Sequence, residues 1–246
     1  AAADIICYMN GYNDPRRAKY FIKSEFDGID YAGIRISIEK PSLNSVGRKY
    51  SGVNVTTEDP LVWMNAAEVA FLKAEAKAVF GFNMGTGTAE EFYNEGIKLS
   101  FEQFGLSGYA EYAEDNENKP ATYADPAGLN SYAGVLSAIT VKWNDAAPAA
   151  EKQERIMIQK WIANFNNGIE AWSDHRRTGY PKFFPATDAG NKSGGSVTNE
   201  FGARRMVYPL AEYSNNGENV NAAVASYLSG PDKMGTCLWW DCNPAV

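Results

Sequence analysis

The sequence contains little of what catalytic and metal-binding sites require. It has a single histidine, His175, and three cysteines, Cys7, Cys237 and Cys242. The short motifs of serine hydrolases, zinc peptidases and phosphate-binding loops do not occur in it, and the cysteines are not spaced as zinc ligands are. We therefore expect no enzymatic activity, no cofactor and no metal, and we interpret the cysteines as buried free thiols. His175 is interpreted as a helix C-terminal cap that interacts with the helix dipole, not as a general base.

An excess of positive charge and a long apolar run are also missing. Lysine and arginine number 23 against 30 aspartate and glutamate residues, which gives a net charge of −7, so nucleic acid is not an expected partner. No segment approaches the run of about 20 apolar residues that spans a bilayer. The sequence does contain 45% hydrophobic and 13% aromatic residues, which is typical of a folded globular protein.

The most regular apolar pattern lies over residues 154–175. Large apolar residues recur there at steps of three or four, which places them on one face of a helix; they are Ile158, Trp161, Ile162, Phe165, Ile169 and Trp172. We predict one helix over this range, with Trp161 and Trp172 as structural residues of its buried face. The following Gly179-Tyr180-Pro181 predicts a turn. We expect Arg176 and Arg177 to stabilise this corner by binding carboxylates or free carbonyl groups.

Two more helices are expected over residues 60–80 and 88–104. The first has a stripe of mostly small residues on one face, formed by Trp63, Ala67, Ala70, Ala74 and Ala78. The second begins at a capping box of Thr88 and Glu91. Because the loop between them is short, the pair predicts an antiparallel hairpin like a tetratricopeptide unit, which needs further helices packed on it. Two carboxylates of the first helix, Glu68 and Glu75, are expected to pair with arginines such as Arg176, Arg177, Arg204 or Arg205.

The remaining segments are expected to be mostly irregular. One short strand is predicted near residues 34–38, and residues 136–143 fit either a short strand or the end of a helix. Near the C-terminus, residues 215–221 are expected to form a loop and residues 221–228 a last short helix. The pair Trp239-Trp240 is interpreted as cover for the core.

A long connection over residues 105–150 holds the candidate ligand-binding residues. They are tyrosines and asparagines: Tyr109, Tyr112, Tyr123, Tyr132, Asn116, Asn118 and Asn130. An aromatic ring can stack on the C–H face of a sugar while amide groups bond its hydroxyls, so this composition fits an oligosaccharide site. The alternative is that the tyrosines only fasten the connection to the helices.

Several motifs, taken in order along the chain, together resemble one family. They are Gly11-Tyr12-Asn13-Asp14-Pro15-Arg16, Trp63-Met64-Asn65-Ala66-Ala67-Glu68-Val69 with Ala74-Glu75-Ala76, Gln159-Lys160-Trp161-Ile162-Ala163, Glu170-Ala171-Trp172, Arg176-Arg177-Thr178-Gly179-Tyr180-Pro181, Arg204-Arg205-Met206-Val207-Tyr208-Pro209 and Trp239-Trp240-Asp241. Over almost its whole length the sequence resembles the SusD/RagB family of nutrient-binding outer-membrane lipoproteins. Members are considerably longer and begin with a lipoprotein signal. The resemblance therefore implies that residues 1–246 form a single SusD-like domain that lacks its N-terminal half.

The resemblance also implies a fold and a function. The expected fold is mainly α, with tetratricopeptide-like helical hairpins, long irregular loops and a few short strands. Family members lie at the cell surface on the outer membrane, held by an N-terminal lipid anchor that this chain does not include. They capture glycans for a SusC-like TonB-dependent transporter without cleaving them. Their ligand platform draws largely on the N-terminal half.

Two alternatives to glycan capture stay open at this point. Peptide capture, as in RagB-like relatives, favours backbone-pairing edges and pockets over flat aromatic rings. A glycoside hydrolase is the weaker alternative, because it needs a pair of carboxylates that flank a cleft. The sequence offers carboxylates but no evidence that any two are so placed.

Overall fold

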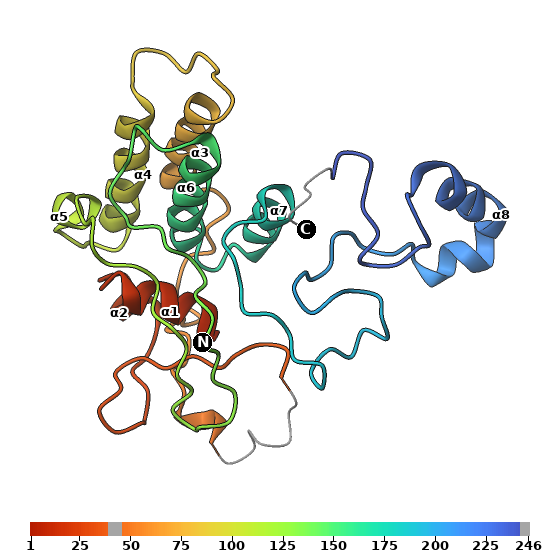
Figure 1. Cartoon of the computed structure of the whole chain (residues 1–246), viewed down its shortest axis with the longest axis horizontal. Coiled ribbons are helices and arrows are strands. Elements are labelled where there is room, and N and C mark those ends of the chain that lie inside the picture. Colours follow the sequence, from red (N-terminus) through yellow and green to blue (C-terminus); the bar gives the residue numbers. More distant parts are fainter. Residues whose placement is uncertain (39–45, 242–246) are drawn as a thin grey trace.

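The computed structural model describes residues 1–38 and 46–241 and confirms a mainly helical fold (Figure 1). Its helices are α1 (Ala3–Gly11), α2 (Arg17–Tyr20), a 3-10 turn η2 (Gly47–Lys49), α3 (Ala66–Ala78), α4 (Ala89–Gln103), α5 (Tyr109–Ala113), α6 (Ala149–Ala163), α7 (Gly168–Thr178) and α8 (Leu210–Tyr227). No helix in these two ranges combines the length and the apolar character that crossing a lipid bilayer requires.

The few short strands that we expected are reduced to isolated β-bridges in the described residues. These bridges join Ala2 to Ile34, Phe21 to Val53, Phe26 to Ile29 and Tyr123 to Tyr132. Of the strand predicted near residues 34–38, only Ile34 pairs with another segment, so this prediction is wrong. Residues 136–143 form neither a strand nor a helix.

The predicted hairpin is present as α3 and α4, which pack against each other and against α6 (Figure 1). The Thr88 side chain accepts from the Glu91 backbone N–H and the Glu91 side chain accepts from that of Thr88, so the capping box is confirmed. The small residues of α3 admit a close partner: Ala67 and Ala74 are buried. On α4, a Cβ at Gly96 would lie 2.7 Å from the ring of Phe71, so glycine is required at this contact.

Helix α3 is shorter than the helix predicted over residues 60–80. Asn65 caps it by accepting a 2.7 Å hydrogen bond from the backbone N–H of Glu68, because an asparagine at this position satisfies a helix N–H that would otherwise lack a partner. Residues 60–65 consequently precede the helix. Trp63 does not belong to the packed stripe and is 81% exposed.

The single helix predicted over residues 154–175 is wrong: the chain forms two helices, α6 and α7. The break falls at Asn166, whose φ is +70°, and asparagine adopts this left-handed region more readily than most residues. Ile158 and Ile162 lie in the core as predicted, whereas Ile169, beyond the break, is 76% exposed. The Asn164 amide donates to Glu68 and accepts from Asn65, which ties the break to α3.

A buried polar cluster joins the N-terminal helices to the hairpin. Arg16 has no exposed surface and forms an ion pair with Asp14, at 2.6 Å between Nη2 and Oδ2. Its guanidinium also donates to Ser100 on α4 and to Gln159 on α6. The Tyr112 hydroxyl donates to Asp14 at 2.9 Å. A buried charge is tolerated only when its hydrogen bonds are made in this way.

The two described cysteines are free thiols, as expected. Cys7 is buried in the core, and burial raises the pKa of its thiol to about 12, so this thiol stays protonated and unreactive. Cys237 is only half-buried, which corrects its prediction as a buried residue. Cys242 lies outside the described residues.

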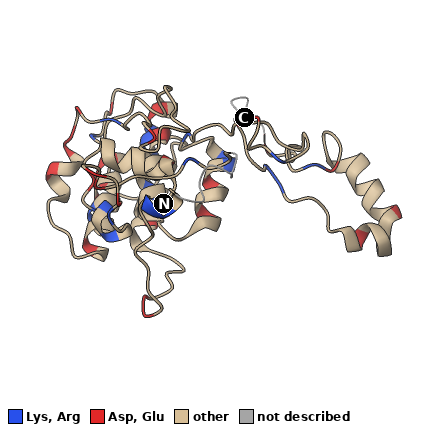
Figure 2. Ribbon diagram, turned by 90° about the horizontal axis from the view of Figure 1, so that it is seen from below, with Lys and Arg blue, Asp and Glu red and all other residues tan. Residues whose placement is uncertain are grey.

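Residues 186–241 form an arm that extends away from the helical body and carries α8 (Figures 1 and 2). Here α8 replaces both the loop predicted at 215–221 and the short helix predicted at 221–228. Its only irregularity is a non-helical Asn216, so the Asn- and Gly-containing stretch bends the helix instead of ending it. Figure 2 shows acidic and basic residues interspersed over the helical body.

Candidate functional site

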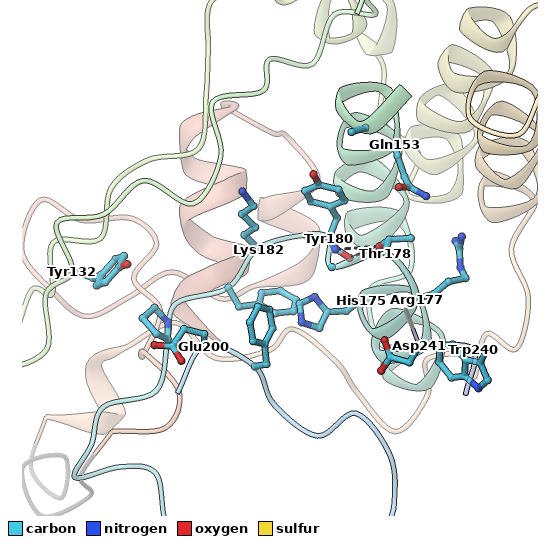
Figure 3. Close-up of a pocket in the computed structure, with 15 residues that line it drawn as sticks. Tyr132, Gln153, His175, Arg177, Thr178, Tyr180, Lys182, Glu200, Trp240 and Asp241 are labelled. Atoms are coloured by element: carbon cyan, nitrogen blue, oxygen red, sulfur yellow. Dashed lines mark hydrogen bonds between the residues drawn. The ribbon is translucent and has the colours of Figure 1, made fainter. Parts of the chain in front are cut away.

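The candidate site is a cavity of about 610 Å³ where α6 and α7 meet the start and the end of the arm (Figure 3). It is lined by Tyr132, Ala150, Gln153, His175, Arg177, Thr178, Gly179, Tyr180, Lys182, Phe183, Pro185, Glu200, Phe201, Trp240 and Asp241. Five of these residues are aromatic rings other than histidine, and most of the others carry polar side chains. This volume and this mixed lining are within the range of small-molecule and cofactor sites.

The corner after α7 supplies the floor of the cavity. The helix ends at Gly179, whose φ of +75° places it in the left-handed region and whose N–H donates to the His175 carbonyl at 2.8 Å, the ending that glycine favours. The Thr178 hydroxyl donates to the Asp174 carbonyl and accepts from the Tyr180 N–H. The predicted turn at this corner is therefore confirmed, and it directs Tyr180, Lys182 and Phe183 towards the cavity.

His175 does not act as the helix cap that the sequence suggested. Its ring Nδ1 lies 3.0 Å from the carbonyl oxygen of Pro181, beyond the end of α7, and its ring packs on Phe183 with centroids 4.6 Å apart. Burial lowers the pKa of His175, and the hydrogen bond to Pro181 opposes this effect only in part. The side chain therefore joins the helix to the following segment as a neutral ring.

An aromatic chain connects the cavity to the core. Phe183 lies between His175 and Trp161, whose ring centroid is 5.3 Å away. Trp161 in turn meets Tyr8 edge-on at 5.5 Å, and the Tyr8 hydroxyl donates to the Lys182 carbonyl. Trp161 is half-buried, which corrects its prediction as a residue of the buried face. Three ring contacts in series and one hydrogen bond thus hold the cavity wall against α1 and α6.

The ion pairs beside the cavity link α3 to α7. Arg177 binds Glu75 through two hydrogen bonds of 2.6 and 2.8 Å, the pairing that the sequence predicted. Glu68 pairs instead with Lys160 of α6, at 3.2 Å, and not with an arginine. Lys160 also binds Asp174 at 2.6 Å.

The opposite wall is built from the arm. Arg176 lies over the ring of Trp172 at 4.2 Å and donates to the carbonyl of Arg204. Arg204 binds both carboxylate oxygens of Asp241, at 2.7 and 2.6 Å. These contacts position Trp240 at the cavity edge, over Arg176 at 5.3 Å. Trp239 and Trp240 do not cover the core, since 83% and 37% of their surfaces are exposed.

The structure does not bring the seven sequence-predicted ligand residues together. Only Tyr132 lines this cavity, at its far side from Trp240 (Figure 3). The other tyrosines point elsewhere: Tyr112 is buried in the Arg16 cluster, and the Tyr123 hydroxyl donates to the carbonyl of Gly33. Tyr109 is half-buried against the core.

The three asparagines are similarly dispersed. Asn116 lines a separate hollow, Asn118 donates to Asp115, and the backbone N–H of Asn130 donates to Asp125. For Tyr112 and Tyr123 these contacts match the alternative in which tyrosines fasten the connection. Ligand binding by any of the seven residues stays a prediction.

Most of the cavity residues were not proposed from the sequence as a site. His175, Tyr180, Lys182, Phe183 and Trp240 come from segments up to 65 positions apart, and no local pattern shows that the arm folds back onto α7. The one available signal was the Arg-Arg-Thr-Gly-Tyr-Pro corner, where the sequence predicted a turn and where the structure places the floor of the cavity. Among the described residues no cluster of three or more His, Cys, Asp or Glu side chains could hold a metal ion.

Comparison with known proteins gives a consistent result. The SusD-like family model, described as "Susd and RagB outer membrane lipoprotein", matches residues 1–241. A SusD homologue from Bacteroides uniformis is 58% identical with a TM-score of 0.95, over 98% of this chain and 49% of its own. One from Bacteroides thetaiotaomicron is 47% identical with a TM-score of 0.89, over 98% and 52%.

A chitin-binding SusD homologue from Flavobacterium johnsoniae is 44% identical with a TM-score of 0.87, over 98% of this chain and 49% of its own. The chain thus spans about half the length of these solved structures. The search of curated proteins gives no match.

Proposed function

This chain belongs to the SusD/RagB family of outer membrane lipoproteins, and we propose that it captures oligosaccharides at the cell surface, without cleaving them, in the cavity between α7 and the arm. The proposal concerns the part of the site that this chain supplies. Of the seven ligand residues predicted from the sequence, Tyr132 is the one that lines this cavity.

The observation that carries this proposal is the composition of the cavity wall. Its rings, among them Tyr180, Phe201 and Trp240, provide faces on which a pyranose can stack, while His175, Lys182 and Glu200 provide groups that hydrogen-bond hydroxyls. Aromatic faces combined with polar groups that fix the orientation of a ligand are typical of small-molecule sites. The net charge of −7 favours neutral or weakly charged glycans over strongly anionic ones.

The chitin-binding relative supports a more definite ligand class. It shares 44% of its aligned residues with this chain, so β-linked N-acetylglucosamine oligomers are the first candidates to test. Because a sugar loses conformational freedom when it is ordered and each stacked ring contributes little, we expect dissociation constants on the order of micromolar to millimolar.

We further propose the cellular context that membership in this family suggests. A lipid anchor on the full-length protein would attach it to the outer membrane, and captured glycan would pass to a SusC-like TonB-dependent transporter. The absence of catalysis is part of the proposal: Asp241, one of the two carboxylate residues lining the cavity, has both oxygens bound by Arg204. An acid/base pair for glycosidic cleavage would need both carboxylates available.

The test is calorimetric titration of the chain with chito-, cello-, xylo- and manno-oligosaccharides and with a mixed peptide library, combined with an assay for new reducing ends. The proposal predicts saturable binding of at least one oligosaccharide and no release of reducing ends. Binding of peptides alone would replace it with the peptide-capture alternative. Reducing ends that accumulate in proportion to protein concentration would replace it with a hydrolase.

A further inference from the structure

We propose that His175 is a specificity-determining residue of this site, which accepts a hydrogen bond at Nε2 from a hydroxyl or amide N–H of the bound sugar. This inference rests on the proposed function, since it names one contact of the same cavity. It goes beyond that function because it fixes the protonation state and the direction of the contact.

The geometry fixes which nitrogen carries the proton. A backbone carbonyl only accepts hydrogen bonds, so the 3.0 Å contact between Nδ1 and the Pro181 oxygen requires Nδ1 to be the donor. In a neutral imidazole the other nitrogen is then an acceptor. The lowered pKa of His175 favours this neutral form.

The surroundings leave that acceptor for a ligand. Within residues 1–38 and 46–241 no side chain or backbone group bonds Nε2. Figure 3 shows His175 in the middle of the lining, between Lys182 and Glu200 on one side and Arg177 and Trp240 on the other. One face of its ring is covered by Phe183, so a hydrogen bond made there is stronger than one made in water.

Several other polar groups of the lining cannot accept a hydrogen bond from a ligand. Lys182 and Arg177 can only donate, and both carboxylate oxygens of Asp241 are bound by Arg204. Besides His175, the groups of the lining that can accept include the exposed carboxylate of Glu200, the side-chain oxygen of Gln153 and the tyrosine hydroxyls. A neutral acceptor between aromatic rings discriminates by hydrogen bonding: it favours a ligand with a donor at that position and rejects an analogue that lacks one.

A matched pair of substitutions separates the two nitrogens. In His175→Asn the side-chain amide can occupy the place of Nδ1, which keeps the bond to Pro181 and removes the acceptor in the cavity. In His175→Gln the amide reaches the place of Nε2, which keeps the acceptor and removes the bond to Pro181. With a chitooligosaccharide as the probe, we expect the folded His175→Asn variant to bind about 10-fold more weakly, a loss of ~1.4 kcal/mol in binding free energy.

We expect His175→Gln to melt at a lower temperature and to retain most of the affinity. Equal affinities for His175→Asn and the parent would overturn the inference while leaving glycan capture intact. If the parent binds no oligosaccharide of the panel, the proposed function and this inference both fail.

A second measurement does not depend on the folding of a variant. His175 is the only histidine in the sequence, so a ¹⁵N spectrum of the untagged full chain contains one imidazole. We expect the free protein to show Nδ1 protonated and Nε2 unprotonated, and saturation with the chitooligosaccharide to shift the Nε2 resonance. A proton on Nε2 in the free protein, or an Nε2 resonance unchanged at saturation, would show that the ring does not accept from the ligand.

Discussion

Arg177 binds Glu75 through two parallel hydrogen bonds, 2.6 Å from Nη1 to Oε1 and 2.8 Å from Nη2 to Oε2. The Glu75 carboxylate is 4% exposed and the Arg177 side chain 37% exposed, so one partner is buried and the other lies at the cavity edge. This pair connects α3 to α7, and it therefore couples the hairpin to the helix that carries the ligand cavity.

The first prediction concerns this pair. Arg177→Lys keeps the charge but loses the planar fork, so we expect a loss of about 1–2 kcal/mol in the free energy of unfolding, the lower part of the range because Arg177 is partly solvated. Urea unfolding measures it, with Lys192→Arg as a control at a position outside the pair. Glycan preference should be unchanged. A variant with parental stability and an altered preference would show that Arg177 acts on the ligand instead.

A second prediction tests the aromatic chain. Trp161 is half-buried between Tyr8 and Phe183, so Trp161→Ala should lower stability by about 2–3 kcal/mol, less than the 3–5 kcal/mol of a fully buried tryptophan. Trp161→Phe should recover most of this loss. If Trp161→Ala unfolds like the parent and loses only ligand, the residue is a surface platform and its structural role is wrong.

The third prediction distinguishes a binding tyrosine from a fastening one. The Tyr112 hydroxyl donates to Asp14 within the buried Arg16 cluster, so Tyr112→Phe leaves a buried carboxylate short of one donor. We expect it to destabilise the fold by about 1–3 kcal/mol and to leave glycan affinity unchanged. Tyr132→Phe, at the cavity, should weaken glycan binding and leave the stability of the fold unchanged. Weaker glycan binding by Tyr112→Phe at parental stability would restore Tyr112 as a ligand residue.

The fourth prediction is a pH dependence of stability. Because the pKa of folded His175 lies below its unfolded value of 6.5, the unfolded chain binds more protons in the window between these two values. Stability from this residue is therefore complete above pH 6.5 and falls as pH decreases through the window.

The check is urea unfolding of the parent and of His175→Asn between about pH 8 and pH 5. The difference between the two curves isolates His175, because the variant retains the neighbouring charged and titratable groups of α7, of the following segment and of the arm: Asp174, Arg176, Arg177, Tyr180, Lys182, Glu200, Arg204 and Asp241. Parallel curves at all pH values would contradict a neutral His175 ring in the folded protein.

Features that depend on residues close together in the sequence were mostly predicted correctly, and features that depend on distant residues mostly were not. The capping box at Thr88 and the glycine ending of α7 depend on residues a few positions apart, and both were predicted correctly. The break between α6 and α7 was missed because the apolar period continues through it. Helix α6 ends at Ala163, and the left-handed Asn166 lies in the short connection before α7.

The candidate site depended on long-range contacts that the sequence does not display. The Tyr8 hydroxyl reaches the Lys182 carbonyl across 174 positions, and Arg204 reaches Asp241 across 37. Tyrosines in the 105–150 connection were grouped because they are close in sequence, yet the structure places Tyr112 in the core and Tyr132 in the cavity. Family resemblance supplied the fold class correctly, and the position of the cavity required the structure.

The central claim, that the rings of this cavity bind sugar, is tested most directly by calorimetry on Trp240→Ala. Trp240 lines the cavity, whereas Trp63, equally suited to stacking and 81% exposed, lies by a separate hollow and serves as the matched control. With a chitooligosaccharide we expect Trp240→Ala to bind about 10-fold more weakly, ~1.4 kcal/mol, at the parental melting temperature, and Trp63→Ala to bind like the parent. Parental affinity in Trp240→Ala, or an equal loss in Trp63→Ala, would contradict the account.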